Sequence, residues 1–259
     1  MAKPTPPEFL NQLADAASKA IMPHFRAPLA VTDKGGGRFD PVTVADRAAE
    51  QAMRVLINAT YPEHGIIGEE YGAERADAEF TWVLDPIDGT RSFITGLPVW
   101  GTLIGLLRDG KPVLGMMAQP FTGERFAGDG KRAWYSGPGG ENIMHARPCP
   151  KLSEASLFTT TPALFKGAEK VAYERVEAAS RMPRYGVDCY AYCMVAAGNA
   201  DLVVEVGLQT YDVVALIPIV EGAGGRFTNW EGGPAAKGGR VVASGDPVLH
   251  DQVLTMLAG

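Results

Sequence analysis

Cysteine is scarce in this chain of 259 residues, which has only Cys149, Cys189 and Cys193. An odd, sparse set without a Cys-x-x-Cys pair argues against a disulfide framework and favours a reducing compartment, so we expect a cytoplasmic protein. Cys189 and Cys193 have no histidine nearby in the sequence, which disfavours a zinc site and favours small buried core residues.

Long hydrophobic runs are absent as well. The longest, such as residues 213–220, fall well short of the roughly 20 residues that a membrane-spanning helix needs. The proline-rich start MAKPTPPEF has no apolar centre, so we do not expect a secretory signal there. Positive charge does not predominate either, because 24 Lys and Arg against 30 Asp and Glu give a net charge of −6. We therefore expect neither a membrane nor a nucleic acid as a partner.

What the chain does have is enough apolar residues, 46 %, to fold around a sizeable core. Amphipathic helices are expected at residues 8–22 and 44–59, and a hairpin over 99–118 with Asp109-Gly110 at its turn. The apolar face of the second helix is expected to consist of Ala45, Ala48, Ala52, Met53 and Leu56. Further strands are expected at 66–67, 82–84, 121–126, 133–135, 156–160, 202–206, 225–228 and 241–244, and helices at 168–180, 190–197, 213–222 and 247–257.

A Gly/Pro-rich segment, SGPGGENI at residues 136–143, is the best internal boundary on composition. We expect an α+β half at residues 1–140 and an α/β half at 141–259. Within the helix expected at 213–222, Pro218 cannot donate to the Val214 carbonyl, so that helix should kink or end early.

The segment WVLDPIDGTRSF brings two carboxylates, Asp85 and Asp88, to the end of an apolar strand, with Glu69 and Glu70 upstream. Carboxylates packed this closely repel each other unless a cation lies between them. Mg²⁺ prefers carboxylate and carbonyl oxygens, and the Ile87 carbonyl is a natural further ligand. A plain Asx turn with Asp88 as a helix N-cap remains the alternative.

Gly89-Thr90-Arg91 follows at once and is expected to open a helix, whose free N–H groups favour an anion. Cation ligands beside an anion cradle suit a phosphate ester bound to metal. Asp212 and Asp46 also stand at expected helix starts. Taken alone, each is better interpreted as a capping residue, and only the whole pattern gives them a functional role.

Four segments, in this order, resemble the motifs of the inositol monophosphatase superfamily, which comprises Mg²⁺-dependent, lithium-sensitive phosphatases. They are DPVTVAD at 40–46, GEE at 68–70, WVLDPIDGT at 82–90, and YD at 211–212 followed by EGAGG at 221–225. Two positions depart from the family pattern: Tyr211 stands where Trp is usual, and Gly222 where Ala is frequent. The resemblance implies a layered αβαβα sandwich of the inositol monophosphatase and fructose-1,6-bisphosphatase type, and a homodimer.

The resemblance also implies roles by position. Glu69, Asp85 and the Ile87 carbonyl would hold one Mg²⁺; Asp85, Asp88 and Asp212 would hold a second; and Asp46 would help with a third. Gly89 and Thr90 would bind phosphate through backbone N–H groups, and Lys34 would belong to a glycine-rich flap. From the residues alone, the KGGG segment at Lys34 is not a Walker loop, and a solvated surface loop is an equal alternative to a flap.

The expected chemistry is in-line attack of metal-activated water on phosphorus near Glu69. Thr90 and Asp46 are candidates for relaying the proton, and no covalent enzyme intermediate is needed.

Within the superfamily, residues 85–107, 186–192 and 215–221 most closely resemble the histidinol-phosphate phosphatases of histidine biosynthesis. Asp188 and Glu205 would suit the cationic amine of such a substrate, and Arg184 completes the expected substrate-binding set. Asp188 has a competing interpretation as the N-cap of the helix expected at 190–197. The alternatives are an inositol-1-monophosphatase or another small sugar or nucleotide phosphatase and, more remotely, a non-catalytic binding protein on this fold.

Overall fold

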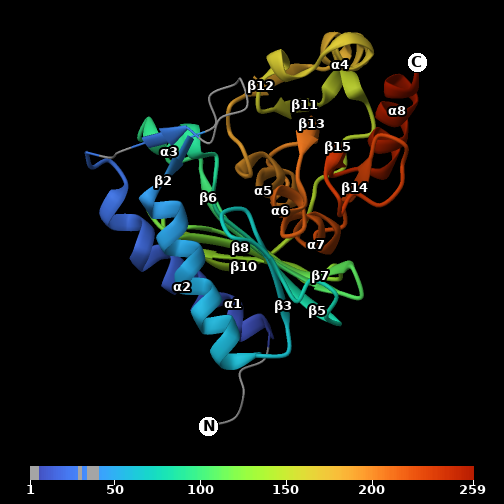
Figure 1. Cartoon of the computed structure of the whole chain (residues 1–259). Coiled ribbons are helices and arrows are strands. Elements are labelled where there is room, and N and C mark those ends of the chain that lie inside the picture. The colour runs from blue at the N-terminus through green and yellow to red at the C-terminus, as the bar shows by residue number, and fades with distance from the viewer. Residues whose placement is uncertain (1–5, 29–30, 34–40) are drawn as a thin grey trace.

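Helices and sheets alternate in five layers, αβαβα, as the family resemblance implies (Figure 1). The computed structural model describes residues 6–28, 31–33 and 41–259. The first layer consists of α1 (Pro6–Ile21) and α2 (Val44–Thr60), which confirms both helices expected at the start of the chain.

The buried face of α2 differs from the expected one. Ala48 is exposed. The buried residues of the helix are Ala45, Asp46, Ala49, Glu50, Met53, Arg54 and Ile57. Three charged residues at spacings of four therefore lie on the inner side of this helix. Sequence periodicity placed only apolar residues there, because it assigns charged side chains to solvent by default.

An eight-stranded sheet forms the second layer, and of its neighbouring pairs only β3 and β5 run parallel. Its strands, in spatial order, are β10 (Gly140–Met144), β9 (Ala133–Gly137), β8 (Glu124–Gly128), β7 (Lys111–Gln119), β6 (Gly101–Arg108), β5 (Phe80–Asp88), β3 (Gly65–Gly68) and β4 (Gly72–Glu74). The β6–β7 hairpin is confirmed, and Asp109 and Gly110 turn it with φ values of 50° and 74°. A separate pair, β1 (Val31–Asp33) and β2 (Pro41–Thr43), precedes α2.

The middle layer holds α5 (Tyr190–Ala196), α6 (Thr210–Val213) and α7 (Leu216–Gly222). The single helix expected at 213–222 is therefore two short helices. The break falls at Val214 and Ala215, where the carbonyl of Val214 has no N–H from Pro218 to accept. This is the interruption that the proline predicts.

Three glycines let this broken helix approach the large sheet. Gly105, Gly115 and Gly128 are paired across β6, β7 and β8, so they form a row. A Cβ atom at any of them would collide with residues 214–219 of α6–α7 and their junction. Glycine in a strand is typical of such a close backbone approach.

The fourth and fifth layers complete the chain. The five-stranded sheet has the order β12 (Met182–Tyr185), β11 (Ser156–Thr159), β13 (Leu202–Leu208), β15 (Gly239–Ser244) and β14 (Arg226–Asn229). Its outer face is covered by α4 (Gly167–Ala179) and α8 (Pro247–Ala258). The edge strand β12 was not expected, because its four residues, MPRY, are all exposed and carry no alternation signal.

Three apolar clusters separate the layers, and alternate residues of one strand enter different clusters. On β5, Trp82 and Leu84 face α1 and α2, whereas Val83 faces the middle layer, whose Cys189 and Cys193 belong to the same cluster. Cys189 and Cys193 are free and buried, as expected, and Cys149 is free and buried as well. None of the helices in the described ranges combines the length and hydrophobicity needed to cross a membrane.

The segment at 136–143 forms the β9–β10 hairpin and lies wholly within the large sheet. The change to the second sheet comes between Met144 and Ser156, so the expected boundary at 140/141 falls inside that hairpin. Glycine marks a tight turn as readily as a linker, and Gly140 turns this one with a φ of 94°.

Candidate active site

A bulge at the end of β5 turns Asp85 and Asp88 to the same side. In a regular strand, residues three apart point to opposite faces. Here Asp85 pairs with Leu103 and Asp88 with Gly101, so three steps on β5 match two on β6. The Ile87 N–H donates to Asp85 Oδ1 at 3.1 Å, which fixes the turn from within.

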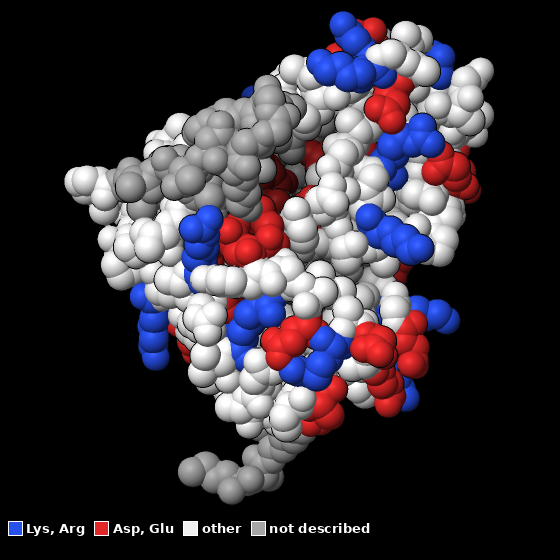
Figure 2. Space-filling model, in the orientation of Figure 1, with Lys and Arg blue, Asp and Glu red and all other residues white. Residues whose placement is uncertain are grey.

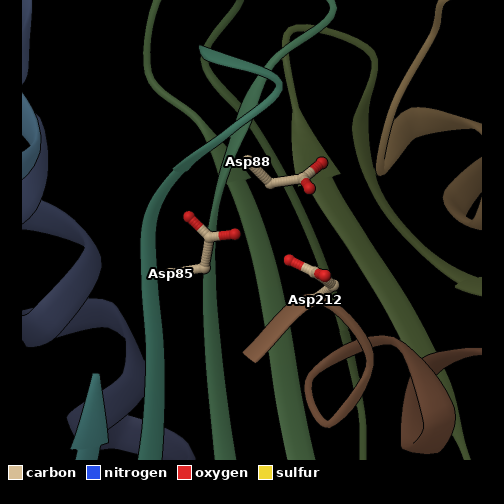
Figure 3. A group of neighbouring side chains, drawn as sticks. All are labelled: Asp85, Asp88 and Asp212. Carbon is tan, nitrogen blue, oxygen red and sulfur yellow. The ribbon is translucent and has the colours of Figure 1, made fainter. Parts of the chain in front are cut away.

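The third aspartate of the cluster, Asp212, comes from α6 on the opposite side of the site. Its Oδ2 accepts a hydrogen bond from the Gln209 N–H at 2.6 Å, so it closes a capping box at the start of α6. Carboxylate oxygens of Asp85, Asp88 and Asp212 all lie within 4.8 Å of one another. Figure 3 shows the three carboxylates pointing into one shared space. The Asp212 side chain therefore both caps α6 and belongs to the acidic cluster.

This concentration of negative charge disfavours ionisation. Burial, then Glu69, Asp88 and Asp212, raise the pKa of Asp85 well above its ordinary value. Burial raises the pKa of Asp212 to about 7, and the pKa of Asp88 is raised by burial, Asp188 and Asp212. On the face drawn in Figure 2, acidic side chains gather in a central hollow.

The donor set fits a hard divalent cation. Three carboxylates converge, and none of the described ion pairs involves Asp85, Asp88 or Asp212. The cluster offers only oxygen donors, which Mg²⁺ prefers over nitrogen or sulfur. Burial and the neighbouring carboxylates raise the pKa of all three, and a cation at this point would relieve the repulsion between them.

Glu69 and Asp46 flank the cluster from the side of α2. Glu69 contacts the Asp85 side chain, and its backbone N–H donates to the Leu84 carbonyl at 3.2 Å. Asp46 accepts from the N–H and the Oγ1 of Thr43, at 2.8 and 2.5 Å, in the capping box of α2. Burial raises the pKa of Asp46 to about 6, and Glu70 and Glu69 add to the shift. The capping alternative for Asp46 is therefore real, although its carboxylate also faces the acidic site.

The loop after Asp88 has the shape that an anion cradle requires. Gly89 has a φ of 83° and precedes α3 (Thr90–Ile94). The first hydrogen bond of this short helix runs from the Phe93 N–H to the Gly89 carbonyl, so the N–H groups of Gly89 and Thr90 precede the helical ladder. Thr90 Oγ1 donates to the Ile87 carbonyl at 3.1 Å, which ties the loop back to the bulge.

The chain matches the inositol monophosphatase family over residues 7–258. It belongs to that family. It is 47 % identical over 259 residues to Bifunctional phosphatase IMPL2 of Arabidopsis thaliana, covering 95 % of this chain and 73 % of the relative. It is 37 % identical over 221 residues to a histidinol-phosphatase of Mycobacterium tuberculosis, covering 84 % of each. The solved structure of an inositol monophosphatase from Zymomonas mobilis superposes with a TM-score of 0.86 at 44 % identity and 96 % coverage of both chains.

Membership confirms the resemblance and the layered fold that the motifs predict. It also makes the chain a phosphatase of this superfamily, a family that depends on metal ions, typically Mg²⁺. The relatives include a histidinol-phosphatase and an inositol monophosphatase, so the comparisons support a phosphate ester as substrate without selecting one.

Asp188 lies against the loop at Gly89. Its Oδ2 accepts from Ser92 Oγ at 2.7 Å, and a Cβ on Gly89 would come within 2.7 Å of that oxygen. Asp188 has a φ of 43°, in the left-handed region, and α5 begins after Cys189 without a side-chain cap. The alternative of Asp188 as the N-cap of α5 is therefore wrong. Burial raises its pKa, while Ser92 and Arg91 act in the opposite direction.

The other expected substrate residues differ in their surroundings. Glu205 is buried on β13 and accepts from the N–H and Oγ1 of Thr160, both at 2.6 Å, and from Tyr192 O–H at 2.9 Å. Arg184 is exposed on β12, and no described contact joins its side chain to the acidic cluster. Lys34 lies outside the described residues.

Sequence reasoning missed several residues that support the site. The Cys189 N–H donates to Asp88 Oδ2 at 2.8 Å, and Ser92 holds Asp188. Glu50 and Arg54 on α2 hold the turn that carries Glu69. The signal for the last two was present, since acidic and basic residues recur every four positions in a helix that also carries a buried apolar stripe.

Proposed function

We propose that this protein is a Mg²⁺-dependent histidinol-phosphate phosphatase. The observation that carries the proposal is the Asp85–Asp88–Asp212 cluster beside the Gly89 loop, with a further carboxylate, Asp188, fixed against that loop. The cluster accounts for the metal, the loop for the phosphate, and Asp188 for a cationic leaving group.

The metal ligands would be Glu69, Asp85, the Ile87 carbonyl, Asp88 and Asp212, enough for two ions. Asp46 would contribute to a third. When bound, Mg²⁺ supplies Lewis-acid stabilisation of phosphate oxygens and makes water a better nucleophile at neutral pH.

The protein's own groups do the positioning. The N–H groups of Gly89 and Thr90 hold the phosphate, while Thr90 Oγ1 orients the Ile87 carbonyl. Glu69 takes the proton from the attacking water, because its carboxylate adjoins Asp85 at the edge of the cluster. Thr90 and Asp46 share no hydrogen bond in the described part of the chain, so Asp46 serves the relay less directly than Glu69.

Substrate choice rests on Asp188. Its partly exposed carboxylate adjoins the phosphate loop, and a protonated amine there would gain a charge-assisted hydrogen bond. Glu205 is a weaker candidate, because Thr160 and Tyr192 already occupy its oxygens. Inositol 1-phosphate is the second candidate substrate, favoured by the similarity to the Zymomonas mobilis enzyme. The complete set of expected ligands argues against a non-catalytic role.

The test compares Asp188→Asn with wild type on two substrates. Loss of a charge-assisted hydrogen bond should lower kcat/KM for histidinol phosphate roughly 10- to 100-fold. Inositol 1-phosphate, which carries no ammonium group, should be hydrolysed at nearly the wild-type rate. Equal losses on both substrates would show that Asp188 only supports the loop.

We also propose that two copies associate, on the basis of the family resemblance. Light scattering at micromolar concentration should give about twice the 27.6 kDa of one chain. A single-chain mass throughout that range would contradict the proposal.

A further inference from the structure

A buried ion pair on α2 holds the turn that carries Glu69. Glu50 is 0 % exposed and lies beneath the turn between β3 and β4. Its Oε2 accepts from the Glu70 N–H at 2.8 Å, and its Oε1 from the Tyr71 N–H at 3.2 Å. Arg54 Nε donates to Oε1 at 2.8 Å. One side chain thus satisfies two backbone donors of a turn that belongs to a different element.

Arg54 extends the same contact along the turn. Its Nη2 donates to the Gly72 carbonyl at 2.5 Å, and its Nη1 lies 3.5 Å from Glu74 Oε2. At the start of the turn, a Cβ on Gly68 would overlap the Glu50 carboxylate. The chain therefore wraps closely around the pair from Gly68 to Glu74.

These bonds fix the backbone on both sides of Glu69. The Glu69 N–H donates to the Leu84 carbonyl on β5, one residue before Asp85. The next N–H, that of Glu70, is held by Glu50. With both peptide groups anchored, the Glu69 side chain starts from a defined point beside Asp85, which it contacts.

We propose that Glu50, supported by Arg54, is a positioning residue that sets the Mg²⁺ affinity of the acidic cluster through Glu69. A buried ion pair is weak evidence for stability, because desolvation offsets much of its attraction. Hydrogen bonds that orient a metal ligand have a more direct effect, since losing one typically weakens metal binding 10- to 100-fold. The inference rests on the proposed function, in which Glu69 is a metal ligand.

The test substitutes Glu50→Gln and measures Mg²⁺ binding by calorimetry without substrate, alongside the Mg²⁺ dependence of kcat. Glutamine keeps one acceptor but turns an NH₂ group toward the N–H donors that Glu50 now satisfies. Mg²⁺ affinity should fall roughly 10- to 100-fold.

Asp246→Asn is the matched control. Asp246 is also a buried carboxylate, and it accepts from the N–H groups of Cys149, Val248 and Leu249 in the outer layer, at the start of α8. It should lower the melting temperature and leave Mg²⁺ affinity unchanged.

Two results would overturn the inference: wild-type Mg²⁺ affinity in Glu50→Gln, or an equal loss of affinity in Asp246→Asn. If Glu50→Gln does not fold, the Arg54→Lys variant tests the inference instead, because lysine keeps the charge but cannot reach both Glu50 and the Gly72 carbonyl. It should shift Mg²⁺ affinity in the same direction, and an unchanged affinity would count against the inference. A wild-type protein that binds no Mg²⁺ would instead overturn the proposed function, and this inference with it.

Discussion

At the scale of single residues, the main feature of the site is the close packing of several acidic side chains around Asp85, Asp88 and Asp212. Each carboxylate of the site raises the pKa of another: Glu69 acts on Asp85, Asp188 on Asp88, and Glu205 on Asp212. Such mutual repulsion destabilises the metal-free fold. Repulsion of this kind is typical of a site that binds a cation. Two predictions follow from it.

The first is that Asp85→Asn nearly abolishes Mg²⁺-dependent phosphate release without unfolding the protein. Asp85 is 2 % exposed and borders Glu69, Asp88 and Asp212, so its charge serves the whole cluster. Removing that charge relieves repulsion, so the melting temperature in a chelator should stay level or rise. Near-native turnover at moderate Mg²⁺ would contradict the two-ion assignment.

The second concerns pH. An aspartate has its ordinary pKa of 3.8 in the unfolded chain, whereas burial raises the pKa of Asp46 to about 6 and that of Asp212 to about 7 in the fold. Between those limits the native state holds more protons, so metal-free stability should fall as pH rises from about 4 to 7. Protons and Mg²⁺ compete for the same oxygens, so the rise in melting temperature caused by Mg²⁺ should be larger at pH 8 than at pH 5. Equal stabilisation at both would count against this account.

The residues named from sequence were those with local signatures. Asp85 and Asp88 share one turn, so their proximity could be predicted from DPID itself. The hydrogen bond from Ser92 to Asp188, 96 positions away, could not be predicted, because it forms only once the segment before α5 packs against α3.

At the scale of elements, the break between α6 and α7 brings Asp212 to the cluster, and the glycine row allows it. Gly115→Ala should push this junction away from β7, because its Cβ would collide with the Ala215 carbonyl. We expect a loss of about 1–3 kcal/mol in unfolding free energy and weaker Mg²⁺ binding.

Gly139→Ala is the control for that substitution, because its Cβ would meet only Tyr135, at 3.8 Å, in an exposed hairpin. Gly139→Ala should leave both the unfolding free energy, measured with denaturant, and the Mg²⁺ affinity close to their wild-type values. Similar losses in both variants would contradict the role of the glycine row.

Elements were predictable where the local pattern determines them. The Asp109-Gly110 hairpin and the interruption by Pro218 follow from backbone chemistry. Edge strand β12 and the glycine row were not predictable, since an exposed strand has no apolar alternation and a close approach depends on the neighbouring layer.

At the scale of the whole molecule, the site lies where the layers meet. Strand β5 of the first sheet supplies Asp85 and Asp88, the middle layer supplies Asp212 and Asp188, and α2 holds the turn that carries Glu69. The order of motifs along the chain predicted this convergence only through the family resemblance. The chemistry of each segment alone left capping roles open, and the structure shows Asp46 and Asp212 in capping boxes.

The most direct measurement is kcat/KM of the wild-type protein for histidinol phosphate and inositol 1-phosphate, side by side, with Mg²⁺ and with a chelator. The account predicts no turnover without metal. With Mg²⁺, a charge-assisted contact to Asp188 kept in the transition state should favour histidinol phosphate roughly 10- to 100-fold. A preference for inositol 1-phosphate would contradict the proposed substrate, and turnover that survives the chelator would contradict the metal-dependent site itself.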